Sequence, residues 1–321
     1  MSDLEAAAVT EESATTVSEA RRWRTPLLLI VLTFATTFWA GALMHGDVDL
    51  TARPLDLLRG WDFALPLMAI LLSHELGHYV AGKIHRVDVS PPYFIPMPLN
   101  MLGTMGAVIR MRGTIHDRNA LLDVGASGPL AGMVIAIPVL VVGIWSSPIE
   151  PLPATGTFLI EGRSIFYVAL LHALKGPIPE GMDIMLSPTA FAGWAGLLVT
   201  MMNLLPVAQL DGGHVAYALL GERQNRVARV LVALLPVVAI ATGAFYGLPA
   251  FLSGNEAWWD EALAGMHWLV WFVVLLVMAR FAGMDHPPTG GGALSPGRKA
   301  VAIGTLVLFV LLFMPSWARV G

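Results

Sequence analysis

Cysteine is absent from the chain of 321 residues, which excludes disulfide bonds, cysteine-ligated zinc and cysteine nucleophiles. Charge is also scarce, because Asp, Glu, Lys and Arg make up 13% of the residues, about half the share found in a soluble domain. The net charge is −4, and no basic cluster is large enough to indicate a nucleic-acid partner. The chain instead has 56% hydrophobic residues in several long runs, which predicts a multi-pass protein of the lipid bilayer.

Seven apolar segments predict transmembrane helices. They lie at residues 26–44, 61–84, about 121–145, from about 188 onward, about 227–246, about 264–281 and about 299–314. Arg21, Arg22 and Arg24 stand before the first segment, and the positive-inside rule therefore predicts a cytoplasmic N-terminus. The small residues at 40–42 could mimic a signal-peptide cleavage site, so retention of the first segment stays open.

The predicted fold class is an all-α polytopic membrane protein with one β-rich insertion. Four prolines between residues 87 and 113 preclude a continuous helix, and the apolar stretch after them suits a strand. We therefore expect a membrane-associated β-hairpin or looped sheet between helices two and three, on the cytoplasmic side. The expected organisation is a disordered cytoplasmic tail at 1–24, a single transmembrane domain at 25–315 with its functional core at about 61–220, and a short C-terminal tail at 316–321.

The second apolar segment contains the pattern His-Glu-x-x-His, formed by His74, Glu75 and His78. On a helix, residues i and i+4 share one face, so the two histidines can bind the same metal ion. Glu75 is close enough to hold a water on that ion. Ionisable residues inside a membrane helix are costly and indicate a functional site. The helix continues for ten residues past His74, or about 15 Å, which places the metal toward the cytoplasmic half of the membrane.

A third metal ligand is needed, because catalytic zinc usually has three protein ligands and a water. Pro206 and the glycine pair at 212–213 predict a break in the helix that starts near residue 188. Asp211 lies at this break and at a matching depth, and we prefer it as the ligand. His214, one helical turn later, is the rival. Asp123, near the start of helix three, is interpreted as a helix-end or structural carboxylate.

Two motifs together resemble the signature of the site-2 protease family of intramembrane zinc metalloproteases. The first is His74-Glu75-x-x-His78 on one membrane helix, and the second is Asn203-x-x-Pro206-x-x-x-x-Asp211-Gly212 on a later helix. The Pro-rich segment between them and Gly128-Pro129 also look like family features. The resemblance covers roughly residues 61–220 and points to compact bacterial and plastid-type members without a PDZ domain.

The resemblance implies a role for each matching residue. His74, His78 and Asp211 would hold one Zn²⁺ ion, Glu75 would be the general base and then the proton donor to the leaving amine, and Asn203 would help to stabilise the oxyanion. The expected activity is hydrolysis of peptide bonds in single-span transmembrane proteins, as in regulated intramembrane proteolysis. The expected location is a bacterial cytoplasmic membrane. The sequence carries no signal for the natural substrate, the cleavage position, the gating of substrate entry or the oligomeric state.

A second class of function also fits part of the pattern, because two histidines and a carboxylate at membrane depth could belong to a metal transporter or sensor without hydrolase activity. Transporters usually have internal repeats, whereas no repeat is visible here and Glu75 fits a base better than a ligand. An inactive scaffold is disfavoured because no motif position is missing. The alternative role for Asn203 is an interhelical hydrogen bond, Gln209 could support a metal ligand, and Gly128 and Gly132 suit close helix packing.

Overall fold

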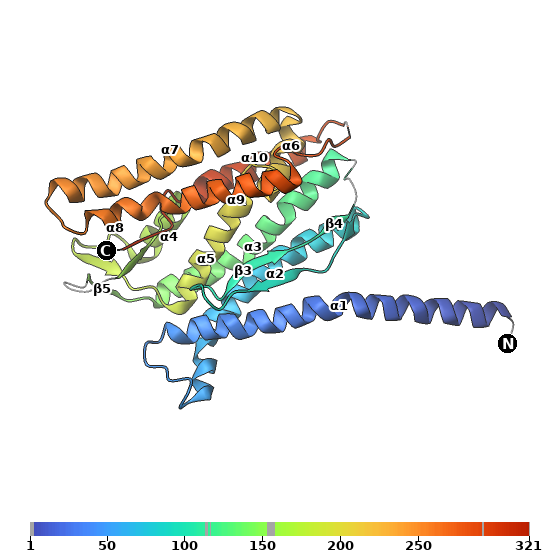
Figure 1. Ribbon diagram of the computed structural model, residues 1–321, viewed down its shortest axis with the longest axis horizontal. Helices are drawn as coiled ribbons and strands as arrows, with labels where there is room; N and C mark the ends of the chain where they lie inside the picture. The colour runs from blue at the N-terminus through green and yellow to red at the C-terminus, as the bar shows by residue number, and fades with distance from the viewer. Residues whose placement is uncertain (1–2, 113–114, 116, 153–157, 291, 321) are drawn as a thin grey trace.

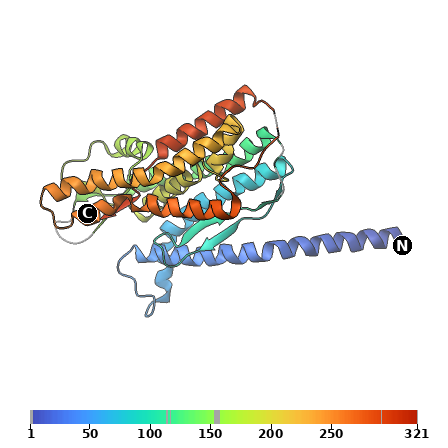
Figure 2. The same cartoon turned by 45° about the horizontal axis from the view of Figure 1, so that its top comes forward.

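The structure is a computed structural model, and it describes residues 3–320 except 113–114, 116, 153–157 and 291. The described part is rich in helices, and most of the long helices lie side by side (Figures 1 and 2). Four helical stretches are long and apolar enough to cross a membrane, at Arg22–Leu43, Arg118–Ser146, Arg223–Leu252 and Trp258–Phe281. This supports the predicted class of helical membrane protein. The other predicted spans correspond to helices that are not among these four.

Helix α1, Asp3–Leu43, includes the first apolar segment and also most of the residues predicted to form a disordered tail. The backbone is drawn as helix from Asp3, and the disordered tail at 1–24 stays a prediction. This polar segment is rich in Ala and Glu, which have high helix propensity.

The centre of the fold consists of α2 (Trp61–Ile84), α3 (Arg118–Ser146) and α5 (Pro188–Asn203), which pack against one another. The bounds of α2 agree with those predicted from the sequence. Asp117 caps α3, because its carboxylate accepts hydrogen bonds from the backbone N–H groups of Asn119 and Ala120. Small residues let the axes approach closely: a Cβ on Gly193 of α5 would lie 2.8 Å from the backbone of Leu140 in α3. The buried apolar core of the protein lies mainly along these contacts.

The predicted helix break is present after α5. The chain leaves the helix at Leu204, passes Pro206 and starts α6, Asp211–Leu220. Gly212 is required here because a Cβ at this position would overlap the carbonyl oxygen of Leu204. The side-chain amide of Gln224, a buried residue of α7 (Arg223–Leu252), donates to the carbonyl of Pro206 at 3.2 Å. The break is thus a packed structure that sets where α6 begins.

Among the described residues between α2 and α3 there are four short strands. They are β1 (Asp88–Val89), β2 (Tyr93–Pro96), β3 (Thr104–Val108) and β4 (Met111–Arg112). β1 pairs with β4 and β2 pairs with β3, in both cases antiparallel. The segment packs against α1 on one side and α2 on the other (Figure 1).

The remaining elements complete the bundle. They are the short 3-10 helices Pro54–Gly60 and Leu263–Gly265, β5 (Ile149–Pro151), β6 (Leu159–Glu161), α4 (Ile165–Lys175), β7 (Met182–Ile184), α8 (Trp258–Ala262), α9 (Met266–Ala282), α10 (Pro296–Leu312) and β8 (Ala318–Val320). β5 pairs with β7, and β6 pairs with β8. The N-terminus of α1, the end of α2, the start of α3 and the start of α10 lie at the same end of the molecule, opposite α8 and the C-terminus (Figure 1).

Candidate metal centre

His74, His78 and Asp211 bring three ligand atoms together. The Nε2 atom of His74 lies 3.2 Å from Oδ2 of Asp211, and Nε2 of His78 lies 3.1 Å from the same oxygen. The two Nε2 atoms are 3.2 Å apart. Both imidazoles are buried, with 3% of His74 and 9% of His78 exposed. Among the described residues these three form the group that could hold a metal ion, and His214 is not part of it.

These separations fit zinc. Zinc–nitrogen and zinc–oxygen bonds of about 2.0–2.1 Å in a tetrahedron place neighbouring ligand atoms about 3.3 Å apart. The donor chemistry fits as well, because two imidazoles and one carboxylate are a common catalytic zinc set that leaves the fourth position open. The three ligand atoms face one point, and a shared cation would stabilise them there better than they stabilise one another. The reason is that the unprotonated nitrogens of two neutral imidazoles are both acceptors and do not attract each other.

The carbonyl oxygen of Val124 fixes the orientation of His78. It lies 2.7 Å from Nδ1 of His78, so Nδ1 donates its proton and Nε2 keeps its lone pair for a metal. The hydroxyl of Ser127 donates to the same carbonyl at 2.9 Å. Our sequence reasoning missed this acceptor, because a backbone carbonyl has no residue-type signal and its position depends on how α3 lies against α2.

The two glycines of α3 that suggested close helix packing lie directly against the two histidines. A Cβ on Gly128 would overlap the imidazole of His78, and a Cβ on Gly132 would lie 3.3 Å from Cβ of His74. On the opposing face, a Cβ on Gly77 would meet the backbone of Ser127. The spacing of four residues in α3 therefore matches the spacing of four residues between the histidines of α2.

A cavity of about 160 Å³ opens beside the three ligand atoms. Glu75, only 7% exposed, lines it together with Asn203, whose Nδ2 lies 3.4 Å from Nε2 of His74. Ala107 and Val108 of β3 form part of another wall. Gln209 also lines the cavity, as do the remaining residues Val89, Ile109, Met111, Val124, Leu210 and His214.

His214 contacts a residue that the sequence analysis did not single out. Its Nδ1 lies 2.8 Å from Nε2 of His286, which comes from the loop between α9 and α10. His286 is buried, stacks on Tyr217 at 4.2 Å between ring centroids, and donates from Nδ1 to the carbonyl of Pro287. Burial lowers the pKa of His286. His214 thus contacts His286, and it is not part of the metal group.

Known proteins resemble the chain over the same region. The chain matches the family model described as peptidase family M50 over residues 62–242. A relative named "Probable zinc metalloprotease EGY2, chloroplastic" from Oryza sativa subsp. indica is 32% identical over 213 residues, which is 64% of this chain and 38% of the relative. The Arabidopsis thaliana protein of the same name is 28% identical, over 81% of this chain and 42% of that one.

A further relative, "Probable zinc metalloprotease EGY1, chloroplastic" from Arabidopsis thaliana, is 29% identical over 80% of this chain and 44% of its own length. The chain spans about two fifths of the length of the curated relatives it matches. These relatives are named as chloroplast proteins of plants, so they give no support to the predicted bacterial membrane. No solved structure matches the chain significantly.

The matched residues 62–242 make up more than half of the chain and include all three members of the metal group, Glu75 and Asn203. The His-Glu-x-x-His helix, the broken helix that presents Asp211 and the match agree on one assignment. The chain belongs to peptidase family M50, the site-2 protease family.

Proposed function

We propose that the chain is an intramembrane zinc metalloendopeptidase that hydrolyses peptide bonds of transmembrane segments. The observation that carries this proposal is the meeting of His74, His78 and Asp211 within 3.2 Å of one another, beside the buried carboxylate of Glu75. The three metal ligands and the Glu75 carboxylate all lie on helices of a membrane protein that belongs to family M50. The carboxylate has no basic partner in the described hydrogen bonds and lines a cavity large enough for several atoms of a substrate.

The residues of the chain have separate tasks in this proposal. His74, His78 and Asp211 hold one zinc ion, which when bound acts as a Lewis acid that polarises the scissile carbonyl and acidifies the attacking water. Glu75 accepts the proton of that water and later gives it to the leaving amine. Asn203 aims its amide N–H₂ group at the side of the cavity next to His74, where negative charge develops on the carbonyl oxygen.

The wall formed by β3 suits an extended substrate. A peptide bond in a helix has its carbonyl oxygen hydrogen-bonded, so a transmembrane substrate must unwind locally before hydrolysis. In the described part of the chain β3 pairs on one edge only, with β2, and Ala107 and Val108 line the cavity. The substrate strand adds to the other edge, where backbone hydrogen bonds replace those of its helix. Single-span membrane proteins are the substrate class that this arrangement favours.

The proposal includes seven spans: α1, α2, α3, the α5–α6 pair, α7, α9 and α10. Basic residues lie at the end of α2 (Lys83) and in the first turns of α3, α7 and α10 (Arg118, Arg223 and Arg298), and Arg22 begins the apolar stretch of α1. The positive-inside rule places these helix ends on the cytoplasmic side, or on the equivalent side of an organelle membrane. The strand segment lies toward this side, and so does the metal centre.

A cleavage assay tests the function directly. The purified protein and its Glu75→Gln variant are each mixed with a single-span test protein in lipid vesicles, with and without a zinc chelator. Wild type should cut the test protein, and the chelator should abolish cleavage. Glu75→Gln should bind zinc as wild type does but cut about 10²–10⁴-fold more slowly, as expected when a general base is lost.

The same vesicles distinguish the proposed protease from the alternative, a metal transporter. A metal-sensitive dye inside the vesicles reports zinc entry in the wild type and in Glu75→Gln. Zinc entry without cleavage, or cleavage that persists in Glu75→Gln, would contradict the proposed enzyme. Zinc binding with no entry and with chelator-sensitive cleavage would support it.

A further inference from the structure

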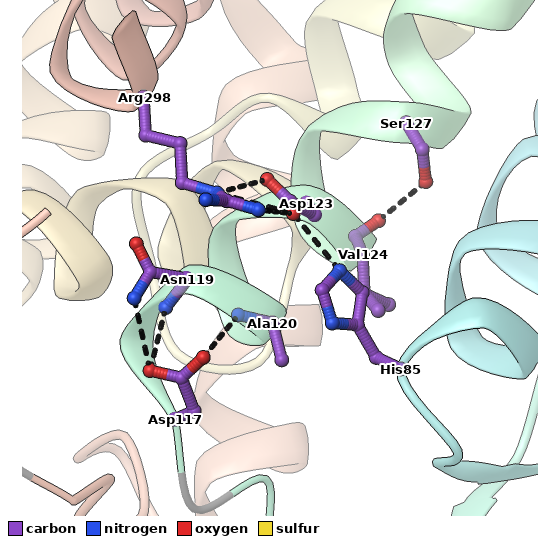
Figure 3. Close-up of polar contacts among 8 residues, drawn as sticks. All are labelled: His85, Asp117, Asn119, Ala120, Asp123, Val124, Ser127 and Arg298. Atoms are coloured by element: carbon purple, nitrogen blue, oxygen red, sulfur yellow. Dashed lines mark hydrogen bonds and ion pairs between the residues drawn. The ribbon is translucent and has the colours of Figure 1, made fainter. Parts of the chain in front are cut away.

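The carboxylate of Asp123 joins three helices at the end of the molecule where α2 ends. Asp123 lies in the second turn of α3, and Figure 3 shows its side chain between those of Arg298 and His85. Nε and Nη2 of Arg298 donate to it at 3.0 Å and 2.6 Å. Nε2 of His85, the residue that follows α2, lies 2.9 Å from Oδ2. Arg298 is in the first turn of α10. We call these three side chains the Asp123 clamp.

The clamp is not a helix cap. Asp117 already satisfies the first N–H groups of α3, as the separate contacts in Figure 3 show. The sequence predicts a helix-end or structural carboxylate at Asp123, and the structure shows that it contacts Arg298 and His85. Two nitrogen atoms of Arg298 donate to the one carboxylate of Asp123. This two-donor geometry fixes the orientation of the Asp123 carboxylate and also balances its charge.

The residue next to Asp123 contacts the metal centre. The carbonyl of Val124 accepts the hydrogen bond from Nδ1 of His78, which holds the imidazole with Nε2 facing Asp211. The clamp is therefore connected to both partners of this hydrogen bond. His85 links the clamp to the end of α2, the helix that carries His78, and Asp123 is the residue before the Val124 carbonyl. A partner that orients a metal-bound histidine is worth roughly 10–100-fold in metal affinity.

We propose that Asp123, Arg298 and His85 are positioning residues that hold the Val124 carbonyl against His78 and thereby set the affinity and geometry of the metal centre. Arg298 lies outside residues 62–242, so α10 contributes to the centre although the family match ends before it. The clamp touches no substrate and no metal. The inference rests on the metal centre of the proposed function and not on the reaction.

Zinc affinity tests the clamp without any measurement of activity. Wild type, Asp123→Asn and Arg298→Gln are stripped of metal in detergent and titrated with zinc against a fluorescent chelator. Each variant should bind zinc about tenfold more weakly, the low end of the effect expected for an orienting partner. The Asp123→Asn/Arg298→Gln double variant should be no weaker than either single one, because all three break the same contact.

Cobalt provides a second readout that a general loss of stability would not move. The visible absorption of a Co²⁺-loaded protein depends on the geometry of its ligands, so the clamp variants should show altered bands at saturating metal. Arg298→Lys, which keeps the charge but loses the two-donor grip, should recover part of the zinc affinity.

A matched control breaks an ion pair elsewhere. Arg319 in β8 contacts Glu261 in α8 at 3.3 Å, and its side chain is 30% exposed against 39% for Arg298. Arg319→Gln should leave zinc affinity and the cobalt spectrum unchanged. If Asp123→Asn fails to fold, Arg298→Gln still tests the clamp, since Asp123 then keeps His85 as its partner.

Three results would overturn the inference. They are unchanged zinc affinity and cobalt spectrum in both clamp variants, an equal loss of affinity in Arg319→Gln, and a wild type that binds no zinc. The last of these would also overturn the proposed metal centre, whereas the first two would leave the proposed protease intact.

Discussion

Nε2 of His74 and Oδ2 of Asp211 lie 3.2 Å apart although 137 residues separate them in the chain. The histidine is on a long continuous helix, and the aspartate is the first residue of a short one. The helix break ends at Asp211, so this residue stands at the N-terminus of α6. From there its carboxylate reaches His74 of α2. If α5 continued through Pro206 as one helix, the position of Asp211 would be set by the turn of that helix and not by the break.

Asp211→Ala should lose zinc, whereas His214→Ala should keep it. Removing one of three ligands is expected to weaken binding by more than about 100-fold, above the range of an outer-sphere partner. His214 is bonded to His286 and lies outside the metal group, so its loss should cost at most about tenfold. Metal analysis of the two purified variants decides between the two residues. Zinc retained by Asp211→Ala and lost by His214→Ala would reverse the assignment.

Gly128→Ala should disturb the metal centre far more than Gly132→Ala. The added methyl at 128 would overlap the imidazole of His78, which cannot move away without leaving the metal. The methyl at 132 would stand 3.3 Å from Cβ of His74, a contact that a small shift relieves. Zinc titration of the two variants, which make the same chemical change on the same helix, measures the difference. Equal affinities would show that α3 moves aside freely.

Asn203→Ala should slow cleavage and keep zinc. If its amide stabilises the oxyanion, kcat should fall about 10²–10³-fold, or about 3 kcal/mol. If it only makes an interhelical hydrogen bond, the variant should lose thermal stability with kcat almost unchanged. Cleavage rates at saturating substrate, zinc content and the midpoint of thermal unfolding separate these readings. A kcat within about threefold of wild type would rule out the catalytic role, because that factor is below 1 kcal/mol.

The loop that carries His286 should weaken the protein at acidic pH. Burial lowers the pKa of His286, so the unfolded chain binds a proton at a pH where the folded chain does not. Stability is therefore full above the unfolded pKa of about 6.5 and falls as the pH drops through it. The midpoint of thermal unfolding in detergent should decrease from pH 7.5 to pH 5.5, conditions that bracket this value.

His286→Gln should show a smaller decrease over the same range, since it keeps an acceptor for His214 but does not titrate. The chain has nine histidines, so the variant must be compared with a histidine control. His172 lies exposed on α4, and His172→Gln should keep the wild-type dependence. Identical pH dependence in His286→Gln and wild type would exclude a contribution from His286.

Local sequence was enough for the features that depend on local geometry. The bounds of α2 follow from one long, largely apolar run, and the facing of His74 and His78 follows from the helical repeat. The break before Asp211 follows from Pro206, which cannot donate a backbone hydrogen bond inside a helix. The disordered tail at 1–24 rests on composition alone and stays a prediction.

The sequence by itself determined the donor types, their spacing on α2 and the membrane setting, because these depend on residue chemistry and helical periodicity. Only the tertiary structure decided that Asp211 and not His214 faces the two imidazoles, that Gly128 and Gly132 lie against them, and that His78 donates to the Val124 carbonyl, next to the Asp123 clamp. Those relationships depend on how α2, α3, α6 and α10 pack against one another. Packing brings together residues that are far apart in the chain, and the local sequence around each residue does not indicate its partner.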